Sequence, residues 1–131
     1  MSKIDLVREY FALICNFSTD PAQFQRLVQP TAQWIEYPNA VTPQTKVRDL
    51  GATLKGAQAG RNLLSAQTIT VENWFESGDQ LLVEGLWTGT VAADTGKFHQ
   101  GQTLQAHMAV VFTFQDGKIV RQANYDCYTP F

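Results

Sequence analysis

One Asp-Gly pair, Asp116-Gly117, separates two long runs of apolar and β-branched residues at 102–115 and 118–128. This dipeptide is typical of a two-residue type I′ turn, because both central positions of that turn need a positive φ. The pattern therefore predicts that the chain ends in a long antiparallel β-hairpin. Two more runs of the same composition, at 67–75 and 80–91, precede it and predict a meander of strands in the second half of the chain.

The first half of the chain shows helical patterns instead. Apolar residues recur at helical spacing after Ser2, and Asp20-Pro21 is typical of an N-cap followed by a proline in the first turn. We predict helices at 2–17, 20–28 and 49–65, a strand at 31–37 and a loop at 39–46. Helices followed by a strand meander predict an α+β fold, in which the helices pack on one face of an antiparallel sheet. The 131 residues are expected to form a single domain, 1–131.

Composition excludes several classes of function. The net charge is −2 and no cluster of Lys and Arg occurs, which argues against a nucleic-acid partner. No run of 18 apolar residues occurs, so no membrane span is expected, and the N-terminus lacks the pattern of a secretion signal. Cys15 and Cys127 lie far apart without metal-ligand spacing, which predicts reduced thiols, no metal site and a cytoplasmic protein.

The predicted hairpin places two titratable residues side by side. If Gln115 pairs with Lys118 across a two-residue turn, His107 lies opposite Asp126 and on the same face as Asn124. A carboxylate beside an imidazole fixes its tautomer and raises its basicity, which makes a general base near neutral pH. The alternative is a structural hydrogen bond on the sheet surface. A β-bulge in the hairpin would shift the register by one residue and separate the pair.

The chain carries more Trp and Tyr than a small core needs, and their N–H and O–H groups require partners. Each one alone is consistent with core packing. Together they predict an aromatic pocket for a small molecule, because such sites combine apolar walls with a few polar groups. Glu36, Glu84, Arg48 and Arg61 are expected at the surface. The candidate substrate-binding residues are Tyr10, Trp34, Tyr37, Trp74, Trp87, Asn124 and Tyr128.

The order of elements, together with YPN at 37–39, EGLWTGT at 84–90 and DGKIVRQANYDC at 116–127, resembles a known superfamily. The chain is similar to SnoaL-like domains of the nuclear-transport-factor-2-like (cystatin-like α+β cone) group. The resemblance implies a curved antiparallel sheet wrapped around three helices, a cone with an internal pocket, and a homodimer formed through the outer sheet face. Relatives include ketosteroid isomerases, polyketide cyclases, limonene epoxide hydrolases and non-catalytic binders, so the fold alone leaves the function open.

The resemblance also implies site residues. Polyketide cyclases of this group use an acidic residue on the last strand, which maps to Asp126, or to Asn124 if a gap is placed differently. Ketosteroid isomerases use a tyrosine on the first helix, matched by Tyr10, and an Asp near the first strand, where this chain has Glu36 and Asn39. The third-strand Arg and Asp of the epoxide hydrolases correspond here to Gly85 and Trp87.

Three functions follow from these observations. The first is a cofactor-independent isomerase or cyclase-like enzyme, in which Asp126 and His107 move a proton next to a carbonyl of a small hydrophobic substrate. The second is a non-catalytic binder of a small apolar ligand. The third is a dimeric interaction module whose pocket is filled by its own side chains.

Overall fold

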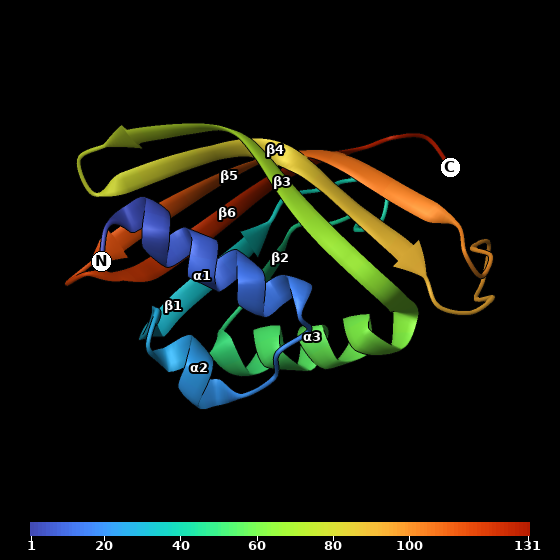
Figure 1. Ribbon diagram of the computed structural model, residues 1–131, viewed down its shortest axis with the longest axis horizontal. Helices are drawn as coiled ribbons and strands as arrows, with labels where there is room; N and C mark the ends of the chain where they lie inside the picture. Colours follow the sequence, from blue (N-terminus) through green and yellow to red (C-terminus); the bar gives the residue numbers. More distant parts are fainter.

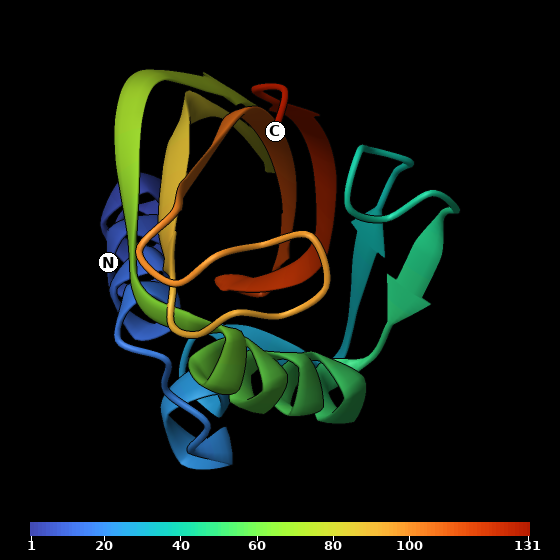
Figure 2. The same cartoon turned by 90° about the vertical axis from the view of Figure 1, so that its right-hand side faces the viewer.

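The computed structural model describes residues 1–131 and places three helices against one side of a six-stranded sheet (Figure 1). The sheet bends strongly around its concave face, as the end-on view shows (Figure 2). This is the predicted α+β cone. None of the three helices has both the length and the hydropathy that a bilayer crossing requires. The elements are α1 (Lys3–Cys15), α2 (Pro21–Gln25), β1 (Val28–Glu36), β2 (Lys46–Arg48), α3 (Leu50–Leu63), β3 (Leu64–Ser77), β4 (Gln80–Val91), β5 (Thr103–Gln115) and β6 (Lys118–Tyr128).

Each helix begins at a capping side chain. Ser2 accepts a hydrogen bond from the Asp5 backbone N–H at 3.1 Å, and Asp20 accepts one from Ala22 at 3.0 Å, with Pro21 next to the cap. Asp49 caps α3 in the same way. These side chains satisfy backbone donors that have no partner inside the helix. The predicted starts of all three helices are therefore confirmed to within a residue or two.

The strands form one sheet in the order β2-β1-β6-β5-β4-β3. Neighbours are antiparallel except for β1 and β6, which run parallel. The sheet is thus mixed at this one pair, whereas the sequence predicted an antiparallel sheet throughout. The short strand β2 lies in a segment for which no strand was predicted, and it extends the sheet beyond β1. Pairing of Trp34 with Arg48 aligns these two residues on β1 and β2.

The core lies between the concave face of the sheet and helices α1 and α2. Tyr10 and Phe112 meet edge to face, with ring centroids 5.9 Å apart, and Phe11 lies 5.8 Å from Phe112. Edge-to-face contacts of this kind add to the free energy gained by burying the rings. The largest fully buried side chains are those of Tyr10, Phe24, Phe112, Leu27, Leu81, Ile119, Val7, Val28, Val83, Val91 and Val110.

The closing hairpin turns where the sequence predicts. Asp116 and Gly117 have φ values of 52° and 78°, and Gln115 pairs with Lys118. Just beyond the turn the register shifts by one residue: Phe114 pairs with Ile119, but Thr113 pairs with Arg121. Val120 is therefore the extra residue of a β-bulge.

The bulge separates the predicted pair of His107 and Asp126. Beyond it His107 lies opposite Cys127, and Asp126 lies opposite Met108. Since side chains alternate between faces, a shift of one residue puts His107 and Asp126 on opposite faces of the sheet. The imidazole is exposed on the outer face, and the predicted His–Asp pair is wrong. The shift of one residue is the physical reason, and it coincides with a register shift on the other side of β6, where β1 pairs irregularly between Val28 and Gln33.

Candidate functional site

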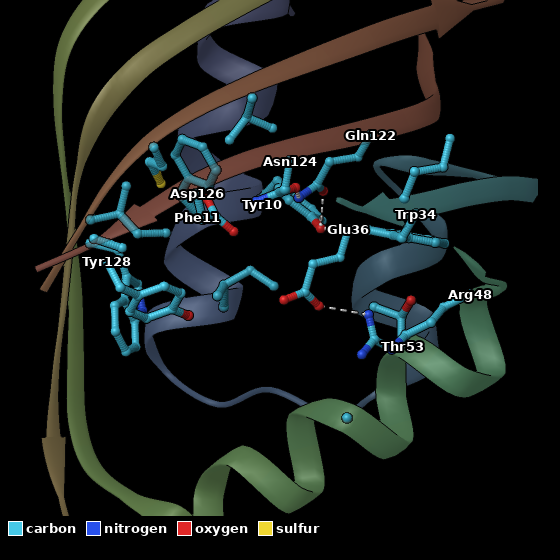
Figure 3. A pocket seen from close by; sticks show the side chains of 18 residues that line it. Tyr10, Phe11, Trp34, Glu36, Arg48, Thr53, Gln122, Asn124, Asp126 and Tyr128 are labelled. Atoms are coloured by element: carbon cyan, nitrogen blue, oxygen red, sulfur yellow. Dashed lines mark hydrogen bonds and ion pairs between the residues drawn. The ribbon is translucent and has the colours of Figure 1, made fainter. Parts of the chain in front are cut away.

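A cavity of about 340 Å³ opens between the concave face of the sheet and helices α1 and α3 (Figure 3). Its volume lies at the lower end of the range of about 300–1,000 Å³ that is usual for small-molecule sites. Most of its lining side chains are hydrophobic, and the polar ones come mainly from β1 and β6. The lining includes Tyr10, Phe11, Trp34, Glu36, Arg48, Thr53, Trp87, Gln122, Asn124, Asp126 and Tyr128.

A chain of hydrogen bonds orders the polar wall. Trp34 Nε1 donates to Tyr10 Oη at 2.8 Å, Tyr10 donates to Gln122 Oε1 at 2.5 Å, and Gln122 Nε2 donates to Asn124 Oδ1 at 2.7 Å. An indole N–H can only donate, so the Tyr10 oxygen accepts from Trp34 and its own O–H remains available for Gln122. The amide of Asn124 therefore accepts through its oxygen and presents its Nδ2 donors to the neighbouring carboxylate of Asp126.

Asp126 is the acid of this wall. Burial and, to a smaller extent, the negative charge of Glu36 together raise the pKa of its carboxyl to about 6, although a hydrogen bond from Asn124 opposes them in part. Both raising effects disfavour the carboxylate form. A carboxyl group with this pKa exchanges protons readily near neutral pH.

Glu36, on the neighbouring strand, has the opposite character. Its carboxylate accepts hydrogen bonds from Asn39 Nδ2 at 3.0 Å and Thr42 Oγ1 at 2.8 Å, and pairs with Arg48 Nη1 at 3.1 Å. Burial alone would raise the pKa of Glu36, but the three hydrogen bonds and the charge of Arg48 outweigh it and hold the pKa below its ordinary value. Glu36 stays ionised and ties the loop at 37–45 to the sheet.

Tyr128 lies beside the acid at the end of β6. Burial, together with the negative charges of Asp126 and Glu36, raises the pKa of its hydroxyl to about 12. The hydroxyl therefore stays protonated and can donate a hydrogen bond. Trp87 contacts the ring of Tyr128 edge to face at 6.0 Å and donates its own N–H to Gln67 at 2.9 Å.

The structure brings together most of the residues that the sequence nominated. Six of the predicted site residues line the cavity: Tyr10, Trp34, Trp87, Asn124, Asp126 and Tyr128. Three do not. His107 is on the outer face, Tyr37 stacks on Tyr125 at 4.8 Å, and Trp74 lines a separate groove next to Arg8, whose guanidinium lies 5.4 Å from its ring.

Four polar lining residues were missed. Glu36 and Arg48 were expected at the surface, and Gln122 and Thr53 were not nominated. A signal for Glu36 was present, because alternation along the strand puts it on the same face as Trp34. Arg48 could be assigned to this face only from its pairing with Trp34 across β1 and β2, which the sequence alone does not predict. Nowhere in the chain do three or more His, Cys, Asp or Glu side chains gather as metal ligands would.

The fold and the cavity define a class of pocket-bearing α+β cones, and comparison with known proteins gives the family. The profile described as "SnoaL-like domain" matches residues 7–122, so the chain belongs to the SnoaL-like family. The match ends before Asn124, Asp126 and Tyr128. No curated protein sequence matches the chain.

Solved structures of the same fold are similar over nearly the whole chain. IdmH from Streptomyces antibioticus, a proposed polyketide cyclase, has 19% identity and a TM-score of 0.79, with 96% of this chain and 92% of that chain covered. A proposed polyketide cyclase from Acidithiobacillus ferrooxidans has 16% identity and a TM-score of 0.73, covering 96% and 91%. A protein of ketosteroid isomerase-like fold from Catenulispora acidiphila has 13% identity and a TM-score of 0.71, covering 95% and 86%. At these identities the likeness shows the fold.

Proposed function

We propose that the protein is a cofactor-independent enzyme that moves a proton next to a carbonyl group of a small hydrophobic substrate, in an isomerase-like or cyclase-like reaction. The observation that carries this proposal is the carboxyl of Asp126, which has a pKa of about 6 inside an aromatic cavity. General bases work best when their pKa lies near the working pH. The names of the similar structures, proposed polyketide cyclases and an isomerase-like fold, agree with this class of reaction.

The proposed reaction begins with the ionised carboxyl of Asp126. It takes a proton from the carbon next to the substrate carbonyl, and the C–H electron pair forms a C=C bond while the carbonyl oxygen gains the negative charge. The Tyr128 hydroxyl and the Asn124 amide are the donors available to that oxygen, since both lie on the same face of β6 as the acid. Asp126 then returns the proton to a second carbon in an isomerisation. In a cyclisation the enolate carbon attacks another carbonyl of the same molecule, and the proton goes to the alkoxide.

Exchange of substrate hydrogens with heavy water tests the proposal. Decalone, a fused bicyclic ketone, is the probe, and loss of the proton signals next to its carbonyl is followed by NMR. We expect the wild-type protein to speed up the exchange, with the rate rising with pH through an inflection near 6. Asp126→Asn should lower the rate by about 10²–10⁴-fold, the usual contribution of a general base.

His107→Ala is the matched control, because this side chain is exposed on the outer face. It should leave the exchange rate unchanged. If Asp126→Asn exchanges hydrogens as fast as the wild type, the catalytic proposal is wrong. If the wild type binds decalone tightly but exchanges no hydrogens, the second candidate function, a non-catalytic binder, is favoured. The mainly hydrophobic lining of the cavity supports that candidate.

We also propose that the outer face of the sheet pairs with a second copy of the chain. Three large hydrophobic side chains are exposed on it: Phe75 at 54%, Tyr125 at 48% and Val47 at 62%. Phe75 also lies beside Leu82 and Val111 across β3, β4 and β5, and a contiguous apolar row on one face of a domain commonly marks an interface. Sedimentation equilibrium of the wild type and of Tyr125→Lys tests this proposal, which fails if both sediment as monomers.

A further inference from the structure

Thr53 carries a polar atom that the protein leaves without a partner. This residue lies in the first turn of α3 and lines the cavity, and its Oγ1 is shielded from solvent without making any hydrogen bond. Buried hydroxyls in folded proteins are nearly always hydrogen-bonded, so an orphaned one calls for an explanation. An oxygen atom of a bound ligand would supply the missing partner.

Arg48 contributes unused donors to the same cavity. Its guanidinium donates through Nη1 to Glu36 at 3.1 Å and makes no other hydrogen bond within the chain. A guanidinium has five N–H donors, so several remain free. In Figure 3, Arg48 and Thr53 lie together near α3, whereas Asp126 and Tyr128 lie on the other side of the cavity.

Gly56 leaves space next to these two residues. It also lines the cavity and lies one helical turn beyond Thr53. A Cβ built on it would meet no atom within 4 Å, so no neighbour in the protein requires a glycine here. Glycine inside a helix is unfavourable relative to alanine. An empty position at the cavity rim, next to unpartnered donors, fits a site that a ligand fills.

We propose that Arg48, Thr53 and Gly56 form a second polar subsite, which binds an oxygen acceptor of the substrate at the end remote from Asp126. The substrate is then a hydrophobic compound with two carbonyl-type oxygens, one for each side of the cavity. The subsite favours a neutral oxygen over a carboxylate, because Glu36 already balances the charge of Arg48. This inference rests on the proposed function only in assigning the first carbonyl to Asp126.

Calorimetric titration with three probes tests the subsite. They are decalone, a decalin dione with its carbonyls on different rings, and a decalone with a carboxylate in place of the second carbonyl. We expect the wild type to bind the dione about tenfold more tightly than decalone, as one additional hydrogen-bonded oxygen allows. The carboxylate should bind more weakly than the dione. Equal affinity for decalone and the dione, or tightest binding of the carboxylate, would overturn the proposal.

Variants of Thr53 distinguish the effect of its hydroxyl group from the effect of its side-chain volume. Thr53→Val keeps the volume and removes the donor, so the preference for the dione should fall at least threefold, whereas affinity for decalone should stay unchanged. Thr53→Ser restores the hydroxyl and should restore the preference. A preference for the dione that is the same in Thr53→Val and in the wild type would contradict the assignment.

Gly56 and Gly60 make a matched pair. Neither has an atom within 4 Å of an added Cβ, but only Gly56 lines the cavity. Both alanine variants should raise the melting temperature, because alanine is the better helix former. Only Gly56→Ala should weaken binding of the dione, by about fivefold or more, as a methyl group enters the ligand's space. Equal affinities in the two variants would show that ligand does not reach α3.

The two proposals can fail separately. If Asp126→Asn abolishes hydrogen exchange but decalone and the dione bind equally well, the catalytic proposal stands and the subsite falls. If the dione is preferred through Thr53 but the wild type exchanges no hydrogens, the subsite stands in a binding protein.

Discussion

Glu36 and Asp126 are two carboxyl groups in one cavity, on neighbouring parallel strands, and their surroundings differ in depth of burial, in hydrogen-bond donors and in the nearest charge. Glu36 receives hydrogen bonds from Asn39, Thr42 and Arg48, whereas Asp126 has only Asn124. Burial pushes the pKa of both upward. Three donors and a positive charge overcome that effect at Glu36, and a single amide does not at Asp126. More donors and a positive neighbour keep Glu36 ionised and structural, whereas deeper burial, a negative neighbour and a single donor leave Asp126 able to exchange a proton.

The backbone around Glu36 also differs from the backbone around Asp126. Glu36 is enclosed by a loop whose own polar groups are satisfied: Asn39 Oδ1 accepts from the backbone N–H groups of Val41 and Thr42 at 2.9 and 2.8 Å. Asp126 lies near the end of the last strand and lines the cavity directly. The first arrangement stabilises the fold, and the second leaves the acid accessible to a ligand.

Replacing Glu36 should have the largest effect. Glu36→Ala leaves Thr42 and Arg48 without their acceptor inside the protein, so the free energy of unfolding should fall by about 3 kcal/mol. Urea denaturation at neutral pH measures the loss. Glu84→Ala is the control, since Glu84 accepts a single exposed hydrogen bond from Asn73. If both variants lose the same small amount, Glu36 does not hold the loop.

Breaking the hydrogen-bond chain that leads to Asn124 should have the second-largest effect on stability. Tyr10→Phe removes the acceptor of Trp34 and the donor to Gln122 at a buried position, which should cost about 2 kcal/mol of unfolding free energy. The control is Tyr37→Phe, because the Tyr37 hydroxyl makes no hydrogen bond and only its ring stacks. An undiminished stability of Tyr10→Phe would mean that the chain of bonds does not order the wall.

Neutralising the acid should make the protein more stable. The pKa of Asp126 rises from 3.8 to about 6 on folding, so the folded state holds its proton more tightly, and this carboxyl lowers stability as pH rises from about 3.8 to about 6. Above that range Asp126→Asn should be more stable than the wild type by about 1 kcal/mol, a value reduced for partial solvation of the group. Below the range the two should unfold alike. Thermal melts across pH measure the difference, and a variant that is less stable at neutral pH would contradict the assigned pKa.

The smallest effect tests the coupling between the two carboxyls. Glu36→Gln removes the charge that adds to the rise in the pKa of Asp126, so the inflection in hydrogen exchange should move to lower pH. Glu84→Gln, which is not among the causes of the shift, should leave the inflection in place. A displacement toward higher pH would show that the two groups interact in some other way.

Local chemistry made much of the fold predictable. Ser2, Asp20 and Asp49 mark helix starts through their own side chains, and Asp116-Gly117 marks the turn through its backbone preference. These signals act within a few residues, so they can be read from the sequence without knowing how the rest of the chain folds.

The site was predictable only in part, because its decisive features depend on distant strands. The sequence predicted Asp126 as a site residue, but its pairing with His107 was wrong, because the bulge at Val120 puts the two side chains on opposite faces. That bulge occurs where β6 also pairs with β1. Arg48 reaches the cavity through its alignment with Trp34 across two strands. No local pattern announces either pairing.

The bulge at Val120 has a consequence for comparing relatives. One unpaired residue exchanges the inward and outward positions of the strand from there to the C-terminus, so that Asn124 and Asp126 face the interior and Tyr125 and Cys127 face away. A homologue with a continuous ribbon would present its odd-numbered equivalents to the ligand instead. Aligning such chains by residue identity alone would therefore match an interior acid with a solvent-facing side chain, and only superposed backbones reveal which acidic groups are equivalent.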